Sequence, residues 1–397
     1  MSDEVAILDK RSGNNYSFGF VRAKKGPSAV DFEDFYEKTG FFIYDPSLRS
    51  VALCKSNITF IDAANSKLYY RGYDLEEIII ERDYLEVVAL MLEGKFLENR
   101  ERLELETRIS PNVEIYDIIV REANSLCKKF SPLELLRVLL MLILGHSSCN
   151  NPYEFISSIP IIIAVINQSL SSKTIGIEDI VRDGYIKSFL SMFFAEKTVD
   201  SRVVNLIEKF LIIHMDHEQN ASTTSVRILT SVDSDLVNII LGGILALEGK
   251  RHGGAGVELI SLLERTSSPS DVRNIINSVK EKGFKIPGVG HRVYTISDPR
   301  ANIMKKIIDK DALVLRDSLF DKLRELEKYV LNDDYFLERK LCPNIDFYSG
   351  IILHSLGIKK EMFLMFFILA RSVGWLAHVK ELMNNKNNII RPRQIFT

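Results

Sequence analysis

The chain has 397 residues, 46% hydrophobic and 26% charged, which is the balance of a globular protein with a sizeable core. Lysine and arginine together number 51 and aspartate and glutamate 53, so no basic excess exists for a dedicated nucleic-acid binder. The acidic N-terminus does not resemble a signal peptide, and no uncharged apolar run reaches the roughly 18 residues of a membrane span. We therefore expect a soluble, cytoplasmic protein with no nucleic-acid or membrane partner.

Short runs rich in β-branched and aromatic residues, separated by Gly, Asn, Pro and Ser, predict strands within residues 1–60. After Tyr73 the apolar residues recur with the period of an α-helix. Helix starts are marked by N-capping residues at Asp74, Ser131, Asp200 and Asp298. A last helix is predicted from about 360 to 383, a proline-free apolar stretch. The pattern indicates an all-α fold with a small β-rich segment at its N-terminus.

Four of the seven histidines lie in short polar or Gly-rich clusters, namely His214, His217, His252 and His291. The other three fall in apolar helical patterns, where a histidine is usually a packing residue: His146, His354 and His378. His214 and His217 are three residues apart and would share a helix face if the helix runs that far. A metal site is nevertheless a minor alternative, because H-E-x-x-H is absent, no third ligand is evident, and the four cysteines form no C-x-x-C pair.

Two glycine-rich segments each contain one of these histidines, His252 in the first and His291 in the second. The HGG at 252–254 would let backbone approach a ligand closely beside an imidazole, with a helix-terminal turn as the structural alternative. GVGHRVY resembles a nucleotide loop only superficially, because Val293 stands where the third glycine would be needed and no strand precedes it.

Several arginines have no obvious acidic partner nearby in the sequence. Arg371 is the most informative, because it lies within FLMFFILARSVGWLAHV, and a buried arginine is rare without an anionic partner. Arg300, Arg391 and Arg393 add three more cations. These side chains could form internal salt bridges, or their guanidinium forks could grip a small di- or tricarboxylate.

Asp346 lies between Ile345 and Phe347 in PNIDFYSG. In an apolar setting desolvation raises the pKa of a carboxyl group, which suits a general base for a carbon acid. Capping of a helix N-terminus is the alternative. Together the histidines, arginines and this aspartate indicate acid–base chemistry on a small polyanion.

Seven segments resemble the citrate synthase family, in the family's order. They are YYRGYDLEEI (69–78), HMDHEQNASTTSVR (214–227), HGGAG (252–256), PGVGHRVY with DPRA (287–301), PNIDFYSGI (343–351), ARSVGWLAH (370–378) and RPRQIFT (391–397). Residues 38–62 further resemble the form with a longer N-terminus found in many Gram-negative bacteria. The resemblance covers nearly the whole chain, and so many long motifs in one order are highly specific.

The resemblance implies an all-α homodimer with a large and a small helical domain and an active site in the cleft between them. It assigns residues 1–60 to a β-rich N-terminal segment, 61–262 with 366–397 to the large domain, and 263–365 to the small domain. The Gram-negative form is often a hexamer, so a hexamer is an alternative to the dimer.

The resemblance also implies the reaction, which is condensation of acetyl-CoA with oxaloacetate and hydrolysis of citryl-CoA to citrate and CoA. Matched to the family's motifs, Asp346 takes a proton from the acetyl methyl group, His252 donates to the thioester oxygen, and His291 polarises and protonates the oxaloacetate carbonyl. Oxaloacetate is expected to bind His217, Arg300, Arg371 and Arg391, the last from the partner subunit. CoA is expected against the loop Ile286, Pro287, Gly288, Val289 and Gly290. Acetyl-CoA is a co-substrate, and neither a cofactor nor a metal is expected, because histidine hydrogen bonds do the polarising.

The chain departs from the family pattern mainly on the acyl-CoA side. Gly256 stands where the family usually has Asn, and Thr295-Ile296-Ser297 replaces a segment that commonly carries a Lys or Arg for a CoA phosphate. Lys250 and Arg251 could supply compensating charge. The T-R-H-T-M stretch of the Gram-negative form appears as 107–111, TRISP, and its later basic and tyrosine residues face neutral positions near Asn167, Gln168 and Ser169. We therefore expect NADH inhibition to be weak or absent.

Two alternative functions stay open. A 2-methylcitrate or other alkylcitrate synthase would use a longer acyl-CoA, and one methylene in a pocket is worth only about 1–3 kcal/mol. The long N-terminus favours acetyl-CoA. A catalytically inactive homologue is disfavoured by the presence of His252, His291 and Asp346, because a binding protein needs no carbon-acid base.

Overall fold

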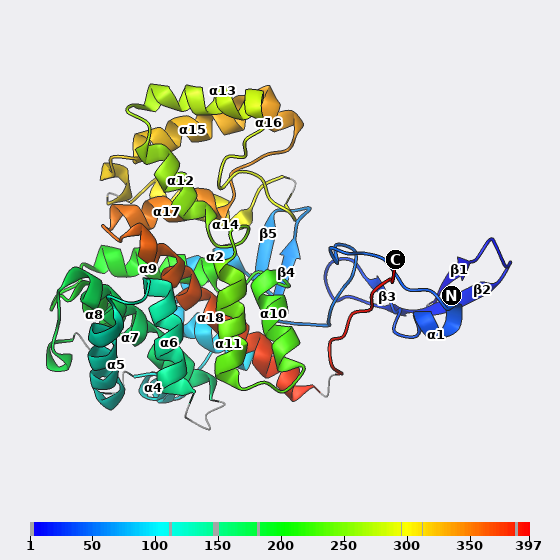
Figure 1. Ribbon diagram of the computed structural model, residues 1–397, viewed down its shortest axis with the longest axis horizontal. Coiled ribbons are helices and arrows are strands. Elements are labelled where there is room, and N and C mark those ends of the chain that lie inside the picture. The colour runs from blue at the N-terminus through cyan, green and yellow to red at the C-terminus, as the bar shows by residue number, and fades with distance from the viewer. Residues whose placement is uncertain are drawn as a thin grey trace.

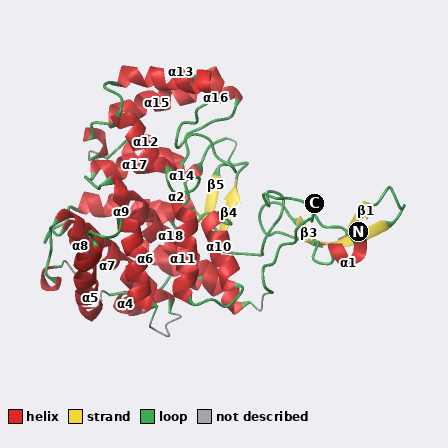
Figure 2. Ribbon diagram, viewed as in Figure 1, coloured by secondary structure: helices red, strands yellow, loops and turns green. Residues whose placement is uncertain are grey.

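The computed structural model describes residues 4–110, 113–145, 151–180, 183–294, 296–311, 313–385 and 388–397. Within these ranges helices dominate and the strands form two small sheets (Figure 2), which confirms the all-α expectation. Thr295, Pro111 and His146, for which the sequence raised expectations, lie outside the described residues.

Both sheets are three-stranded and antiparallel. The first contains β1 (Glu4–Leu8), β2 (Asn15–Val21) and β3 (Ala29–Val30), and the second contains β4 (Thr59–Asp62), β5 (Lys67–Tyr70) and β6 (Tyr73–Asp74). Strands within residues 1–60 were expected, but the second sheet continues beyond that limit. It does so because Arg71 and Gly72, both with positive φ, turn β5 back into β6.

The helices of the lower body in Figure 1 pack against α18 (Phe363–Asn384) or against helices that contact it. They are α2 (Leu75–Glu81), α3 (Tyr84–Glu93), α4 (Asn99–Arg108), α5 (Val113–Leu126), α6 (Pro132–Leu144), α7 (Pro152–Ser171), α8 (Tyr185–Phe194), α9 (Ser201–His214), α10 (Ala221–Thr230) and α11 (Leu236–Glu248). The upper part of Figure 1 contains α12 (Ala255–Glu264), α13 (Val272–Lys282), α14 (Pro299–Ile308), α15 (Phe320–Asn332), α16 (Asp334–Glu338) and α17 (Ile345–Ser355).

The expected capping residues begin four of these helices. Asp74, Asp200 and Asp298 each accept a hydrogen bond from the backbone N–H two residues later, at the starts of α2, α9 and α14. At α6, Glu134 accepts from the backbone and hydroxyl of Ser131. These starts could be predicted because each depends on groups within one helical turn.

The core helix α18 is buried along nearly its whole length and carries the fully buried Trp375. Its bounds agree with the expected 360–383, with a short 3₁₀ turn at Lys360–Met362 before it. By length and apolar composition alone, Pro152–Ser171 and Lys360–Asn384 could cross a membrane, but 67% and 94% of their apolar windows are buried inside the protein. The structure therefore uses both as internal helices.

The two ends of the chain lie together on an arm that projects from the body (Figure 1). The arm contains β1, β2, β3 and α1 (Phe35–Thr39), and the Arg393 guanidinium of the C-terminal tail lies over the rings of Tyr36 and Phe42. At the root of the arm, Glu381 of α18 accepts from the Ser56 hydroxyl and the Asn57 backbone. The arm is therefore tied both to the tail and to the core helix.

Candidate active site

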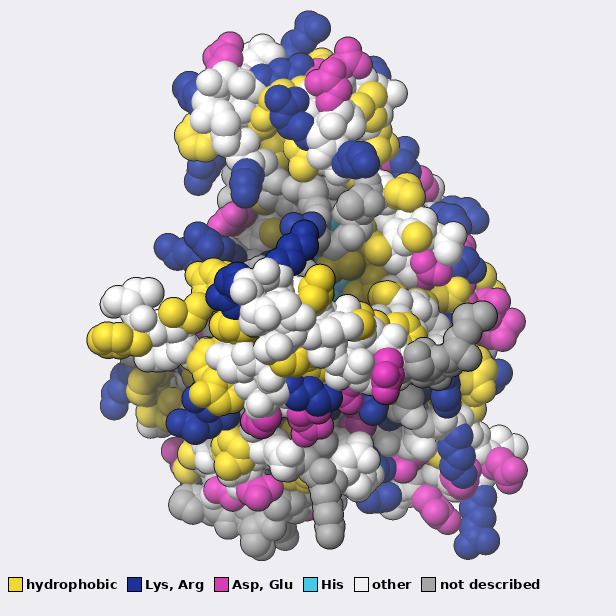
Figure 3. Space-filling model, turned by 90° about the vertical axis from the view of Figure 1, so that its right-hand side faces the viewer, with side chains coloured by type: hydrophobic (Ala, Val, Ile, Leu, Met, Phe, Trp, Pro, Cys, Tyr) yellow, Lys and Arg dark blue, Asp and Glu magenta, His cyan; other side chains and the backbone are white. Residues whose placement is uncertain are grey.

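The body and the upper part of the molecule enclose a hollow with histidine visible at its bottom (Figure 3). Six expected site residues converge there: His217, His252, His291, Arg300, Arg371 and Asp346. The ring centres of His217 and His291 lie 5.4 Å apart, although the two residues are far apart in the sequence. α14 packs against α9, β5 and α17, and Ser349 of α17 bonds to His214 of α9, which brings these groups together.

His217 lies on the turn between α9 and α10. His214 and His217 do not share a helix face, because α9 ends at His214 and does not run as far as His217. His214 is buried and bonds to Phe210 and Ser349 instead. Among the described residues, no group of three His, Cys, Asp or Glu side chains could hold a metal ion.

His291 has a defined tautomer. Its Nδ1 accepts the backbone N–H groups of Val293 (3.0 Å) and Tyr294 (3.2 Å). Burial, assisted by the Arg300 charge, lowers the pKa of His291 to about 4, so the ring is neutral near pH 7. The single proton of the neutral ring therefore lies on Nε2, which can donate to a substrate oxygen.

His252 stands just before α12 (Ala255–Glu264), whose N-cap position is occupied by Gly254. Its Nε2 lies 3.2 Å from the Ser222 hydroxyl and 3.3 Å from the Asn220 side-chain oxygen. Burial, with the Arg371 charge, lowers its pKa to about 4. His252 is thus a second neutral imidazole, and the α10 start holds it in place.

Arg300 is paired within its own helix turn, contrary to the expectation that no nearby acid was available. Asp298 accepts from the backbone of Arg300, from its Nε (3.1 Å) and from its Nη2 (2.9 Å). Both side chains are buried, with Asp298 1% and Arg300 4% exposed. The pair holds the guanidinium in one orientation at the start of α14.

Arg371 is buried in α18 and donates from Nε to the carbonyl of His214 at 2.9 Å. Within the described part of the chain, no acidic side chain forms a salt bridge with it, so internal pairing does not explain this arginine. The charge of Asp216 acts on it from nearby. Its remaining N–H groups are available to an anionic ligand.

Asp346 occupies the first turn of α17 but does not cap it, because the Asn344 side chain accepts the Asp346 backbone N–H. The capping alternative is therefore wrong. Burial raises the pKa of Asp346 to about 6 although Arg300 opposes the shift. A carboxylate with this pKa is ionised at neutral pH and more basic than an exposed one.

The loop Ile286–Gly290 borders a cavity of about 440 Å³, which is also lined by Phe284, Lys285, Arg292, Tyr335, Phe336 and Leu341. Gly288 and Gly290 have positive φ, and a Cβ on Gly288 would lie 2.8 Å from the Phe347 backbone. Asn344 donates to the carbonyls of Gly288 and Gly290. Asn344 therefore links the loop that borders the cavity to the start of α17, the helix that carries Asp346.

The positions that depart from the family pattern on the acyl-CoA side have the following surroundings in the structure. A Cβ at Gly256 would meet only ordinary contacts, the nearest being 3.7 Å from the Asp346 carbonyl oxygen, so this glycine is not required by crowding. In the 295–297 segment, the Ser297 hydroxyl bonds to Ser66 at 3.1 Å. Lys250 and Arg251 are exposed.

Arg391 does not join the site of its own chain. It lies on the exposed C-terminal tail that accompanies the arm (Figure 1). The hollow described above is formed without it.

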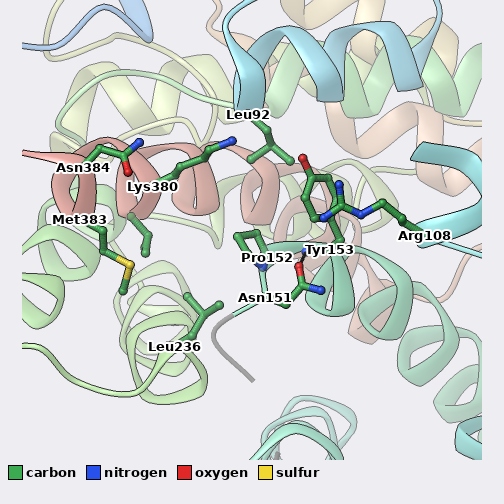
Figure 4. A pocket seen from close by; sticks show the side chains of 10 residues that line it. Leu92, Arg108, Asn151, Pro152, Tyr153, Leu236, Lys380, Met383 and Asn384 are labelled. Atoms are coloured by element: carbon green, nitrogen blue, oxygen red, sulfur yellow. Dashed lines mark hydrogen bonds between the residues drawn. The ribbon is translucent and has the colours of Figure 1, made fainter. Parts of the chain in front are cut away.

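A second cavity, of about 270 Å³, lies between α18, α11 and the start of α7 (Figure 4). Its lining includes Arg108 from the 107–111 stretch, whose guanidinium lies 3.8 Å from the Tyr153 ring centre. Lys380, also in the lining, is paired with Glu93 at 2.6 Å. The cations of this cavity are thus already engaged by side chains of the protein.

Three supporting residues were missed at the sequence level. Asp298 orients Arg300, Ser222 contacts His252, and the Tyr294 hydroxyl lies 3.0 Å from His217 Nε2. Asp298 could have been found, because capping at N2 places its carboxylate beside residue 300. The other two contacts depend on tertiary packing.

Comparisons with known proteins match the same family over nearly the whole chain. A family model described as citrate synthase, C-terminal domain, matches residues 47–393. A citrate synthase of Helicobacter pylori is 32% identical over 422 aligned positions that cover 99% of each chain. The solved citrate synthase from Thermotoga maritima superimposes with a TM-score of 0.77 at 28% identity, over 89% of this chain and 96% of that one. The solved ternary complex of carboxymethyl coenzyme A and oxaloacetate with citrate synthase from the archaeon Thermoplasma acidophilum superimposes with a TM-score of 0.80 at 25% identity. The match covers 88% of this chain and 95% of that one.

We predict that His252 and His291 stay neutral down to about pH 5 in the folded protein. Their ring NMR signals should titrate near pH 4. The urea-unfolded chain provides the control, because its histidines should titrate near pH 6.5. Titration of either folded ring between pH 6 and 7 would contradict the desolvation described above.

Proposed function

Because the chain belongs to the citrate synthase family, we propose that it condenses acetyl-CoA with oxaloacetate and hydrolyses citryl-CoA to citrate and CoA. The observation that carries this proposal is one buried site that combines a carboxylate of raised pKa with two neutral imidazoles and two arginines. This set supplies a base, two hydrogen-bond donors and a dicarboxylate site, which the condensation requires.

In the proposed first step, Asp346 removes a proton from the methyl group of acetyl-CoA. The resulting enolate carries its negative charge on the thioester oxygen, where His252 donates a hydrogen bond. A neutral imidazole is suited to this role, because it stabilises the developing oxyanion without a prior protonation. The raised pKa of Asp346 makes the carboxylate a stronger base for this weak acid.

In the second step, the enolate carbon attacks the keto carbon of oxaloacetate, and the keto oxygen becomes the hydroxyl of citryl-CoA. His291 donates its Nε2 proton to that oxygen, consistent with the tautomer set by the two backbone N–H groups at Nδ1. The ring regains a proton from solvent and Asp346 releases the methyl proton to solvent, so both groups return to their starting states. Water then cleaves the thioester, which releases citrate and CoA. The chain's own residues supply every polar contact in this scheme, so we propose no cofactor and no metal.

Oxaloacetate would be held by Arg300, Arg371 and His217. Arg300 is pre-oriented by Asp298, and Arg371 keeps N–H groups for the substrate. Fixed guanidinium groups bind carboxylates bidentately with little loss of side-chain entropy. CoA would lie along the loop 286–290 and its 440 Å³ cavity, with Lys285 and Arg292 available for its phosphates.

We further propose that 263–365 moves as a small domain against the remaining body, and that the active assembly is a homodimer. Arg391, exposed on the tail, would then complete the site of the partner subunit. Exposed apolar side chains on α6, α10 with the turn that follows it, and α11 offer a surface for the second copy: Met141, Leu142, Ile228, Val232 and Leu245.

NADH inhibition is proposed to be weak or absent. Asn167 and Gln168 donate their amides to the carbonyls of Phe193 and Met192 and are thus engaged inside the protein. In the cavity of Figure 4, at the other end of α7, Lys380 is already paired with Glu93. Few unpaired cations remain there for a dinucleotide phosphate.

The direct test is CoA release, followed with a thiol reagent, from purified protein given oxaloacetate and acetyl-, propionyl- or butyryl-CoA. We expect oxaloacetate-dependent release that is fastest with acetyl-CoA. Preference for a longer acyl group would assign the protein to the alkylcitrate synthases. Absence of release with all three donors would contradict the proposed function.

Asp346→Asn should lower kcat by a factor on the order of 10²–10⁴, because the amide cannot accept the methyl proton. Oxaloacetate binding, measured by calorimetry, should change little. In the unmodified enzyme kcat/KM for acetyl-CoA should fall as the pH drops through about 6, where Asp346 becomes protonated. Asp321→Asn, an exposed site on α15, is the matched control and should leave both parameters unchanged. Near-normal turnover of Asp346→Asn would show that another group is the base.

The partner role of Arg391 can be tested by mixing subunits. Arg391→Ala and Asp346→Asn should each be nearly inactive as homodimers. Unfolding and refolding them together in equal amounts should restore about a quarter of the activity, because half of the dimers are mixed and one site in each is intact. No recovery from refolded mixtures that contain mixed dimers would place Arg391 outside the partner's site.

A further inference from the structure

Tyr294 lies between two site histidines. Its side chain is buried, with 4% exposed, and its ring centre lies 4.7 Å from that of His291 and 5.6 Å from that of His217. Its hydroxyl oxygen is 3.0 Å from Nε2 of His217. None of the proposed catalytic steps uses this hydroxyl.

The protonation states of the pair limit how they can hydrogen-bond. Burial raises the pKa of Tyr294 well above its ordinary value, so the phenol keeps its proton. Burial, with the charge of Arg300, lowers the pKa of His217 well below its ordinary value, so its ring is neutral. A neutral imidazole has one N–H donor and one acceptor nitrogen.

Only one direction of this hydrogen bond satisfies the tyrosine. Among the described residues, His217 is the sole polar partner of the Tyr294 hydroxyl, so the phenol proton has no other acceptor. In the reverse direction the phenol O–H would be the unpaired donor. If the phenol donates to Nε2, the tyrosine is paired and the unpaired donor is the imidazole N–H, which a bound ligand can accept. The His217 proton then lies on Nδ1, for which the described residues provide no partner.

The consequence concerns an anionic substrate. A carboxylate only accepts hydrogen bonds, so an Nδ1–H group attracts it, while an Nδ1 lone pair would repel it. We propose that Tyr294 is a positioning residue, whose hydroxyl holds His217 in the Nδ1–H tautomer and thereby enables His217 to donate to oxaloacetate. This inference rests on the proposed function for the identity of the anion.

The same bond links two parts of the structure. Tyr294 follows the loop of the upper part, at the entrance to α14, whereas His217 belongs to the turn between α9 and α10 in the body. The donor tautomer of His217 is therefore favoured only while these parts are in contact. Oxaloacetate affinity is in this way coupled to their approach.

Tyr294→Phe removes the hydroxyl and keeps the ring. We expect KM for oxaloacetate to rise about fivefold to tenfold, the usual effect of one neutral hydrogen bond. kcat and KM for acetyl-CoA should stay within about twofold, because neither the base nor the CoA loop is altered. An unchanged KM for oxaloacetate, or a kcat loss as large as the KM change, would overturn the proposal.

Tyr116→Phe is the matched control. It removes another buried tyrosine hydroxyl, which donates to the Ile175 carbonyl at 2.9 Å in the body, away from the site. A general loss of packing or stability should affect both variants alike, as monitored by thermal unfolding. Only Tyr294→Phe should change KM for oxaloacetate, and an equal change in Tyr116→Phe would reduce Tyr294 to a structural role.

The tautomer itself can be measured without turnover. In protein labelled with ¹⁵N-histidine, the His217 ring signals, assigned with His217→Gln, should show a protonated Nδ1 in the unmodified chain and a mixture of tautomers in Tyr294→Phe. A protonated Nε2 in the unmodified chain would overturn the proposal. Failure of the proposed function would appear separately, as absence of oxaloacetate-dependent CoA release from the unmodified enzyme.

Discussion

The buried ion pair between Asp298 and Arg300 is the contact on which the geometry of the site depends. The Asp298 carboxylate accepts from the backbone and guanidinium of Arg300 and also from the backbone N–H of Ile345. One side chain therefore joins the first turns of α14 and α17, and α17 carries Asp346 at its next residue. Loss of either partner would leave an uncompensated buried charge, at a cost of about 3–5 kcal/mol. The spacing between the cation and the base is thus held by the same interaction that stabilises the two helices.

Burial affects the acidic and basic groups of this site in opposite directions, and the proposed chemistry needs both effects. Removal from water raises the pKa of Asp346 and lowers the pKa values of His252 and His291. The carboxylate becomes a stronger base while the imidazoles remain neutral donors. A water-exposed version of the same residues would have a weaker base and partly charged histidines near pH 6.5. Enclosure between the upper part and the body is accordingly a condition of the chemistry.

The chain ends are organised around α18, which connects the site to the arm. Arg371 faces the site near the middle of this helix, and Glu381 secures the root of the arm near its end. Beyond the helix, the tail returns to the arm, where Arg393 packs on aromatic rings. This course leaves Arg391 outside its own site. The placement supports the proposal that a second copy of the chain receives it.

The amino-acid sequence by itself determined the helix starts at Asp298 and Ser131 and the choice of the site residues, because capping acts within one turn and the motifs are contiguous. Only the tertiary structure decided that Asn344, and not Asp346, caps α17, and that His217 leaves the helix face of its neighbour. It also decided that the Tyr294 hydroxyl lies beside the His217 ring. The physical reason is that these outcomes depend on which helices pack together and exclude water, and residue spacing along one chain does not encode distances between segments far apart in sequence.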